Sequence, residues 1–182
     1  MNRIRISAAL GLILLTACLS TPSEPGAEGD VTSVILVRHA EKETTPGDPP
    51  LSERGRKRAI ELARVLADAG VDVLSATQFG RTQQTLEPLS EQLGLEIEIA
   101  TVDLDDTGGY ARGLAAAILE EHRGRTILLA GHSNTVPLLL EAFGIADPPS
   151  LSDDDYDDLF LIHIVPAEQP WMIHLHYGEP SP

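Results

Sequence analysis

Val31-Thr-Ser-Val-Ile-Leu-Val37, followed directly by Arg38-His39, is the stretch of sequence that decides the fold. A short apolar run rich in β-branched residues is typical of a buried strand, and this run stops where two polar side chains begin. A proline-rich loop, residues 44–50, comes next, and Ser52 can then cap a helix. A buried strand that leads into a helix predicts the first unit of an α/β fold.

Strand-like and helix-like segments alternate along the rest of the chain. We expect helices at 52–70, 81–93, 109–122 and 135–143, and strands at 71–75, 95–102, 126–130, 159–165 and 171–177. The last two strands are predicted to be antiparallel because only about five residues join them. In the first helix the apolar residues that recur at helical spacing are Ala59, Ile60, Ala63, Val65 and Leu66. This order predicts one α/β domain, residues 31–178, around a mostly parallel sheet of about six strands.

The composition limits the classes of partner. The chain has 182 residues, of which 42% are hydrophobic, and its 13 Lys and Arg against 28 Asp and Glu give a formal charge of −15. This acidity opposes non-specific binding to nucleic acid or to an anionic membrane, because both require a cationic surface. An anionic ligand would therefore need a local cluster of cations. The sequence gives no indication of the oligomeric state.

The first 17 residues predict a secretory signal peptide. Arg3 and Arg5 precede an apolar run, residues 8–15, that is too short to span a bilayer as a mature helix. The following Leu-Thr-Ala-Cys18 resembles a bacterial lipobox, which predicts cleavage before Cys18 and lipidation of this cysteine. A plain signal peptide with an incidental cysteine is the alternative. Cleavage would remove two Arg and no acid, so the charge of 13 − 28 = −15 would become 11 − 28 = −17.

Residues 18–30 are predicted to be the lipidated cysteine and a flexible tether, because they combine Pro, Gly, Ser and Glu with little apolar surface. We therefore expect an exported lipoprotein, anchored to the cell envelope on its periplasmic or extracellular face. The lipid would be its only contact with the membrane.

Polar motifs follow three of the predicted strands. Arg38-His39 follows the first, the segment up to Arg81 follows the second, and Gly131-His132 follows the fourth. Ligands of open parallel sheets bind beyond the carboxyl ends of the strands, so these motifs can converge on one cleft. Two Arg and two His on an acidic protein indicate a phosphoryl ligand, which Arg binds through paired hydrogen bonds.

Four motifs, in order, resemble those of the histidine phosphatase superfamily, the phosphoglycerate-mutase-like fold. They are VRHAEK at 37–42, LSERG at 51–55, SATQFGRTQQT at 75–85 and AGHSN at 130–134. The resemblance runs from about Val34 to Val165 and suggests a small exported lipoprotein subgroup. It implies a three-layer sandwich and a phosphatase of the histidine acid phosphatase type.

The resemblance also implies roles for individual residues. His39 would be the nucleophile that takes the phosphoryl group, which requires a neutral imidazole. Arg38 and Arg81 would bind the phosphate oxygens, and His132 would be a second phosphate ligand, as a cation or a hydrogen-bond donor. Water would then hydrolyse the phosphohistidine. No metal or other cofactor is expected, because these side chains supply the positive charge.

The proton donor for the leaving group is less well defined. In the phosphoglycerate-mutase branch the acid follows a Leu-x-Glu pattern, and here Leu104-Asp105-Asp106 stands at that place. Asp106 matches the Glu position, Asp105 is the next candidate, and Asp103 lies just before them. The alternative is an acidic loop that caps the helix at Gly109.

Two other polar residues have open roles. Asn134 could donate to the phosphate or cap the helix that begins at residue 135. Glu41, beside the nucleophile, could line the substrate site or be solvated. His174 and His176 lie on one face of the last strand, but with no third ligand in view they are expected to be an ordinary surface pair.

The predicted function is therefore metal-independent hydrolysis of phosphomonoesters, or of phosphohistidine on a protein. One alternative is a phosphoglycerate-mutase-like phosphotransferase, although the short loops favour an open site. The other is a non-catalytic phosphate-binding lipoprotein.

Overall fold

The computed structural model describes residues 31–181. The predicted signal peptide, the lipidation at Cys18 and the tether before residue 31 lie outside the described residues. Within residues 31–181, no helix is both long and apolar enough to cross a bilayer.

Six strands form one sheet in the order β3-β2-β4-β1-β5-β6. The strands are β1 (Thr32–Arg38), β2 (Val73–Ala76), β3 (Ile97–Ile99), β4 (Thr126–Gly131), β5 (Asp158–Ile164) and β6 (Trp171–His176). The first four run parallel to one another, whereas β5 is antiparallel to β1 and β6 is antiparallel to β5. The structure thus confirms the predicted mostly parallel sheet and the antiparallel final pair.

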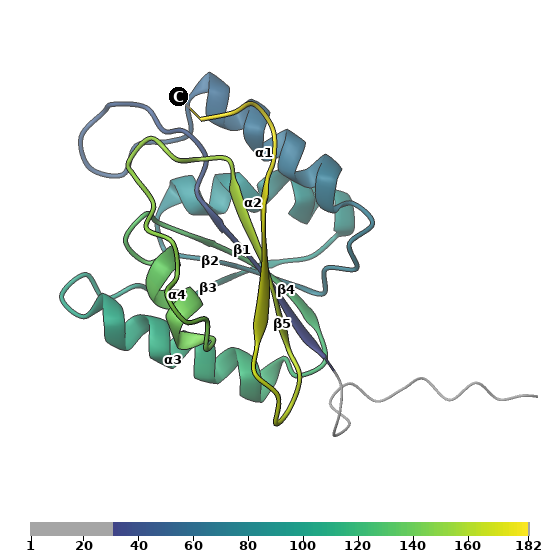
Figure 1. The fold of residues 1–182 in the computed structure, drawn as a ribbon. Coiled ribbons are helices and arrows are strands. Elements are labelled where there is room, and N and C mark those ends of the chain that lie inside the picture. Colours follow the sequence, from purple (N-terminus) through teal and green to yellow (C-terminus); the bar gives the residue numbers. More distant parts are fainter. Residues whose placement is uncertain (1–30, 182) are drawn as a thin grey trace, which may run out of the picture.

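Four helices cover the two faces of the sheet (Figure 1). They are α1 (Glu53–Leu66), α2 (Gly80–Leu93), α3 (Thr107–Glu121) and α4 (Val136–Ala142). On one face α1 and α2 pack on apolar residues of the central strands such as Val37 and Leu128, and on the other α3 and α4 pack on residues such as Leu36 and Phe160. Because successive side chains of a strand point to opposite faces of the sheet, the apolar core has one part on each face. The sheet and the helices on its two faces form the predicted three layers.

Two predicted elements differ from the structure. The third strand has only the three residues Ile97–Ile99 instead of 95–102, because β3 pairs with β2 alone and β2 has only four residues. The first helix ends at Leu66 rather than near Gly70. Its Ile60 and Val65, counted among the apolar positions, are 62% and 42% exposed, while Leu62 lies fully buried. Which residues of α1 are buried thus depends on how the helix packs on the sheet, and not on hydrophobicity alone.

Candidate active site

His39 lies just beyond the end of β1 and is only 3% exposed. Its backbone N–H donates to the Gly131 carbonyl at 2.9 Å, which continues the pairing of β1 with β4. Its side-chain Nδ1 lies 2.8 Å from the Ala40 carbonyl oxygen. Because a carbonyl can only accept, Nδ1 carries the proton and donates it. In the neutral ring, Nε2 therefore keeps its lone pair, as a nucleophile requires.

The surroundings of His39 keep the ring neutral. Burial lowers the pKa of His39 to about 3, and the positive charges of Arg38 and Arg81 act in the same direction, against the hydrogen bond to Ala40. A charged imidazole is disfavoured because it would lose its hydration and repel the two guanidinium groups. His39 is therefore neutral at all pH values at which the protein is expected to work.

Arg38, the last residue of β1, is held by the loop that precedes β5. Its Nη1 donates to the carbonyl oxygens of Ser152 and Asp155 at 2.7 and 3.0 Å. Its guanidinium carbon lies 4.1 Å from the centre of the Tyr156 ring, a cation–π contact. The loop thus fixes one edge of the guanidinium group, and its buried Nε has no hydrogen-bond partner among the described residues.

Arg81, at the N-terminal end of α2, is held in a similar way. Its Nη1 donates to Asp48 Oδ1 at 3.0 Å, and its guanidinium carbon lies 4.4 Å from the centre of the Phe79 ring. Its Nε is also buried without a partner among residues 31–181. Thr85 links this arginine to the nucleophile, since its hydroxyl donates to the Arg81 carbonyl and accepts from the Ala40 N–H.

His132 follows β4 and has its tautomer set by its neighbours. Arg81 Nη2 can only donate, so His132 Nδ1, 3.3 Å away, accepts. His132 Nε2 then carries the proton and donates to Thr77 Oγ1 at 3.0 Å. The Thr77 hydroxyl in turn donates to Thr82, whose own hydroxyl donates to the Phe79 carbonyl. This chain of hydrogen bonds holds the imidazole edge-on to His39, with 5.3 Å between the ring centres.

From its motif, His132 is expected to act as a cation or a hydrogen-bond donor toward phosphate. In the structure, burial and the charges of Arg81 and Arg38 lower the pKa of His132 to about 4. The ligand-free site therefore has a neutral His132 with an accepting Nδ1. The positive charge of the site comes from the two arginines.

The four residues Arg38, His39, Arg81 and His132 are thus brought together, as their motifs predict. Their arrangement combines a neutral imidazole with two guanidinium groups. Guanidinium groups bind the oxygens of a tetrahedral oxyanion through charge-assisted, often paired, hydrogen bonds. The site is therefore suited to bind a phosphoryl group beside a nitrogen nucleophile.

The Glu41 carboxylate, expected either to line the substrate site or to be solvated, pairs instead with two arginines of α1. This carboxylate accepts from Arg58 at 2.7 Å and forms an ion pair with Arg54 at 3.0 Å, both on α1. Arg58 is 3% exposed and also donates to the Tyr177 carbonyl, so the pair ties the loop after β1 to α1 and the C-terminal tail. A Cβ at Gly55 would overlap the Glu41 carbonyl oxygen, so glycine permits this close approach.

Asn134 and Asp106 also lie differently from the simplest expectation. Asn134 is exposed, and Thr135 occupies the N-cap position of α4 without a side-chain capping hydrogen bond, because its hydroxyl accepts from the His132 N–H instead. Asp106 caps α3 by accepting from the Gly109 N–H at 2.7 Å, as the capping alternative predicted. Among the described residues, no hydrogen bond or ion pair joins Asp103, Asp105 or Asp106 to the histidines or arginines of the site.

Three residues of the site were not expected from the sequence. Asp48 lies in the proline-rich loop, which has no periodic pattern, and accepts from both Arg81 and the Gly80 N–H. Tyr156 lies in the acidic run before β5, and the aspartates around it give no indication of its contact with Arg38. Thr77 stands inside the motif SATQFGR, so its polar side chain directly after a strand was the one available signal.

Part of the chain is similar in sequence to known proteins. Residues 34–106 match the family model described as "Histidine phosphatase superfamily (branch 1)". Phosphoserine phosphatase 1 of Hydrogenobacter thermophilus is 34% identical over 101 residues, which cover 50% of this chain and 47% of that protein. The chain thus spans about half the length of this curated relative.

Solved structures share the fold. The protein histidine phosphatase SixA complexed with tungstate superposes with a TM-score of 0.63 at 19% identity, covering 79% of this chain and 96% of the other. A mycobacterial glucosyl-3-phosphoglycerate phosphatase gives a TM-score of 0.60 at 17% identity, covering 73% and 90%. The fold is that of the phosphoglycerate-mutase-like histidine phosphatases. Residues 34–106 by sequence, and the chain by its fold, are thus similar to proteins of the histidine phosphatase superfamily.

Proposed function

We propose that this protein is a phosphatase that hydrolyses phosphomonoesters, or phosphohistidine on a protein, through a phosphohistidine formed on His39. The observation that carries the proposal is the neutral, buried His39 ring, whose proton lies on Nδ1, in one cluster with His132 and the guanidinium groups of Arg38 and Arg81. The phosphatases named among the similar proteins support the same class of reaction.

The proposed reaction has two steps. Nε2 of His39 attacks phosphorus, the N–P bond forms, and the bond from phosphorus to the leaving oxygen breaks. Water then attacks the phosphohistidine, the N–P bond breaks, and inorganic phosphate leaves. In both steps Arg38 and Arg81 stabilise charge on the three non-bridging oxygens, which is the main catalytic requirement of phosphoryl transfer.

His132 would change its protonation when phosphate binds. The phosphate negative charge opposes the effect of the two arginines and raises the pKa of His132 from its low value. A proton taken up on Nδ1 would convert this atom from an acceptor of Arg81 into a donor toward phosphate. The role expected for His132 would thus appear only in the complex.

The leaving group needs a proton, and we propose Asp48 as its source. Its carboxylate forms an ion pair with Arg81. A phosphate bound to Arg81 would displace this carboxylate, which would take up a proton from solvent and pass it to the leaving oxygen. Asp106, the acid expected from sequence, remains the second candidate although it caps α3.

Two substrates distinguish the candidates. An alkyl phosphate needs protonation of its leaving oxygen, whereas p-nitrophenyl phosphate does not. If Asp48 is the acid, Asp48→Asn lowers kcat on the alkyl phosphate by about 10²-fold or more and changes p-nitrophenyl phosphate hydrolysis far less. Asp106→Asn is the matched control. The reverse pattern would assign the role to Asp106.

The experiment that tests the mechanism is trapping of the intermediate. Brief incubation with ³²P-labelled substrate, followed by an alkaline quench that preserves phosphohistidine, should leave label on His39 and none on the His39→Ala variant. Label on a serine, or undiminished hydrolysis by His39→Ala, would contradict the proposal.

We also propose that the chain is exported and anchored by lipid on Cys18. The order of basic residues, apolar run and lipobox-like segment before Cys18 supports this. Acyl chains contribute about 0.8 kcal/mol per buried methylene, which suffices for a domain too acidic to bind anionic lipid directly. Cys18→Ser should move the protein out of the membrane fraction. Wild-type protein found unlipidated in the cytoplasm would disprove the anchor.

A further inference from the structure

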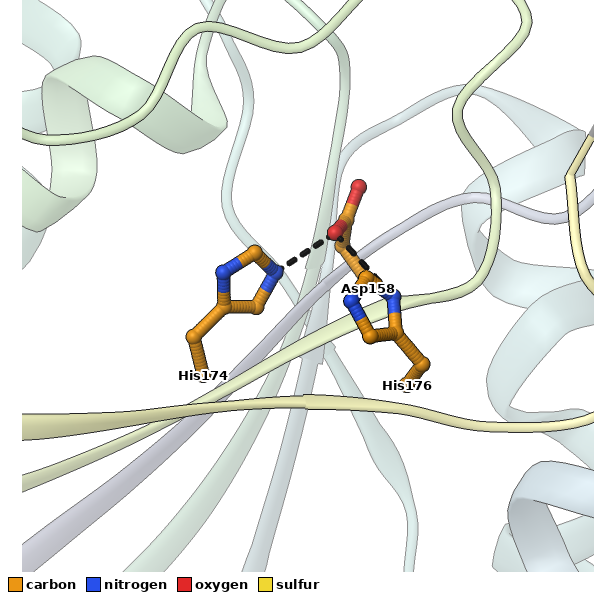
Figure 2. A group of neighbouring side chains, drawn as sticks. All are labelled: Asp158, His174 and His176. Carbon is orange, nitrogen blue, oxygen red and sulfur yellow. Dashed lines mark hydrogen bonds and ion pairs between the residues drawn. The ribbon is translucent and has the colours of Figure 1, made fainter.

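A second cluster of histidines lies outside the catalytic residues, where β5 begins and β6 ends. The register pairs Asp158 with His176 and Phe160 with His174 across the two antiparallel strands. Since residues two apart share a face, Asp158, His174 and His176 project from the same side of the sheet. Figure 2 shows both imidazole rings turned toward the Asp158 carboxylate.

The three side chains bring possible ligand atoms close together. Asp158 Oδ1 lies 2.6 Å from His174 Nε2 and 3.5 Å from His176 Nδ1, and one ligand atom from each residue falls within 4.8 Å of the others. In a tetrahedral zinc site with bonds of about 2.0–2.1 Å, ligand atoms are roughly 3.3 Å apart. Metal binding would require the shortest contact to widen and the two histidine nitrogens, which lie within 4.8 Å of each other, to adjust to this spacing. The His174 side chain is 36% exposed and can turn.

The carboxylate at the centre has no permanent cation. Asp158 is 7% exposed, and within the described residues its only ion-pair partners are the two histidines. A buried carboxylate is usually paired with a Lys, an Arg or a metal. Asp157, whose Oδ2 lies 3.6 Å from His176 Nδ1, adds a second acid at the edge of the cluster. A divalent cation would neutralise this local charge.

We propose that Asp158, His174 and His176 form a site for a divalent transition metal, of which Zn²⁺ is the best fit. Two imidazoles and one carboxylate are ligands of zinc, whereas calcium and magnesium prefer oxygen ligands alone. The fourth position is filled by water or by Asp157. The sequence showed the two histidines without a third ligand, and the strand register supplies it.

The site is structural rather than catalytic. It joins the first residue of β5 to the last residues of β6, an edge strand that pairs with β5 alone. A metal here cross-links the edge of the sheet at the end of the loop that holds Arg38. Binding to the folded state alone then stabilises the protein according to metal concentration.

The test is a zinc titration of the full-length chain in competition with a chromophoric chelator. We expect one equivalent to bind with a Kd of micromolar or below, and the His174→Ala/His176→Ala double variant to bind at least about tenfold more weakly. His163→Ala is the matched control: His163 lies on β5 but contacts Ser33 and Trp171 instead. It should bind zinc as the wild type does.

Two further measurements distinguish zinc binding at Asp158, His174 and His176 from zinc binding at other residues of the chain. Zinc should raise the Tm of the wild type and of His163→Ala, but not of the double variant. His176→Ala alone, at a side chain that is 62% exposed, should weaken binding without loss of fold, as circular dichroism would show. Equal affinity in the double variant and the wild type, or no binding to the wild type at micromolar zinc, would overturn the proposal.

Discussion

Two pairs of histidines lie at the same end of the sheet and have opposite surroundings. Burial keeps His39 and His132 neutral, and the positive charges of Arg38 and Arg81 act in the same direction. His174 and His176 are more exposed and face the carboxylate of Asp158. One residue type thus gives a proposed nucleophile and anion site where its neighbours are arginines, and a proposed cation site where its neighbour is an aspartate. The charge of the neighbouring side chain, more than the histidine itself, determines whether the site favours an anion or a cation.

The sharpest test of this contrast is to remove one histidine from each pair. His39→Ala should lower kcat on p-nitrophenyl phosphate by roughly 10³-fold or more, because no other group replaces the nucleophile. His174→Ala should leave kcat unchanged. More than a few per cent of the wild-type rate in His39→Ala would mean that the nucleophile is misassigned.

The next largest effect should follow from removing Arg81, one of the two arginines that lie beside His39 and His132. Arg81→Ala should lower kcat/KM by about 10²–10³-fold, since it removes a donor to the developing charge on phosphate. Arg81→Lys should recover only part of this loss, because ammonium cannot form the paired contacts of guanidinium. The control is Arg64→Ala, which removes an exposed arginine of α1 that pairs with Glu61. Equal rates for Arg81→Ala and this control would exclude Arg81 from the phosphate site.

A smaller effect concerns acid stability. The unfolded chain binds protons on histidine with a pKa of about 6.5, whereas the folded values are about 3 for His39 and about 4 for His132. Below pH 6.5 the unfolded state therefore holds more protons, so the free energy of unfolding falls as the pH falls. Each histidine should contribute a loss of up to about 2 kcal/mol between pH 8 and pH 5.

Urea denaturation at several pH values measures this loss. The His39→Asn/His132→Asn double variant should show a flatter dependence of the free energy of unfolding on pH. A slope equal to that of the wild type would show that these two rings do not titrate as described.

The smallest expected effect is that of metal removal on the reaction. Treatment with a chelator should strip zinc from Asp158, His174 and His176 and lower the Tm, with no measurable change in kcat under conditions where the protein stays folded. Restoration of a lost rate by added magnesium or zinc would show instead that a cation takes part in phosphoryl transfer.

Local sequence patterns predicted most of the fold because each pattern is fixed by nearby residues. The buried run before Arg38 predicted β1, Ser52 capped α1 as expected, and Gly94 ends α2 in the left-handed conformation. The motifs also indicated Arg38, His39, Arg81 and His132, since the carboxyl ends of parallel strands share one edge of a sheet.

Side-chain partners could not be predicted in the same way. Glu41 stands beside the nucleophile in sequence, yet its carboxylate turns to Arg58, which becomes its neighbour only when α1 packs on the sheet. Asp48 lies 33 residues before Arg81 and meets it through loop geometry that no periodicity encodes.

The sequence by itself determined the order of strands and helices and the four residues that gather at the carboxyl ends of the parallel strands, because hydrophobic periodicity and motif order are local properties. Tertiary structure alone decided the protonation of His39 and His132, the pairing of Glu41 with Arg58, and the meeting of Asp158 with His174 and His176. These depend on burial and on contacts between distant segments. Both arise only when the layers pack together.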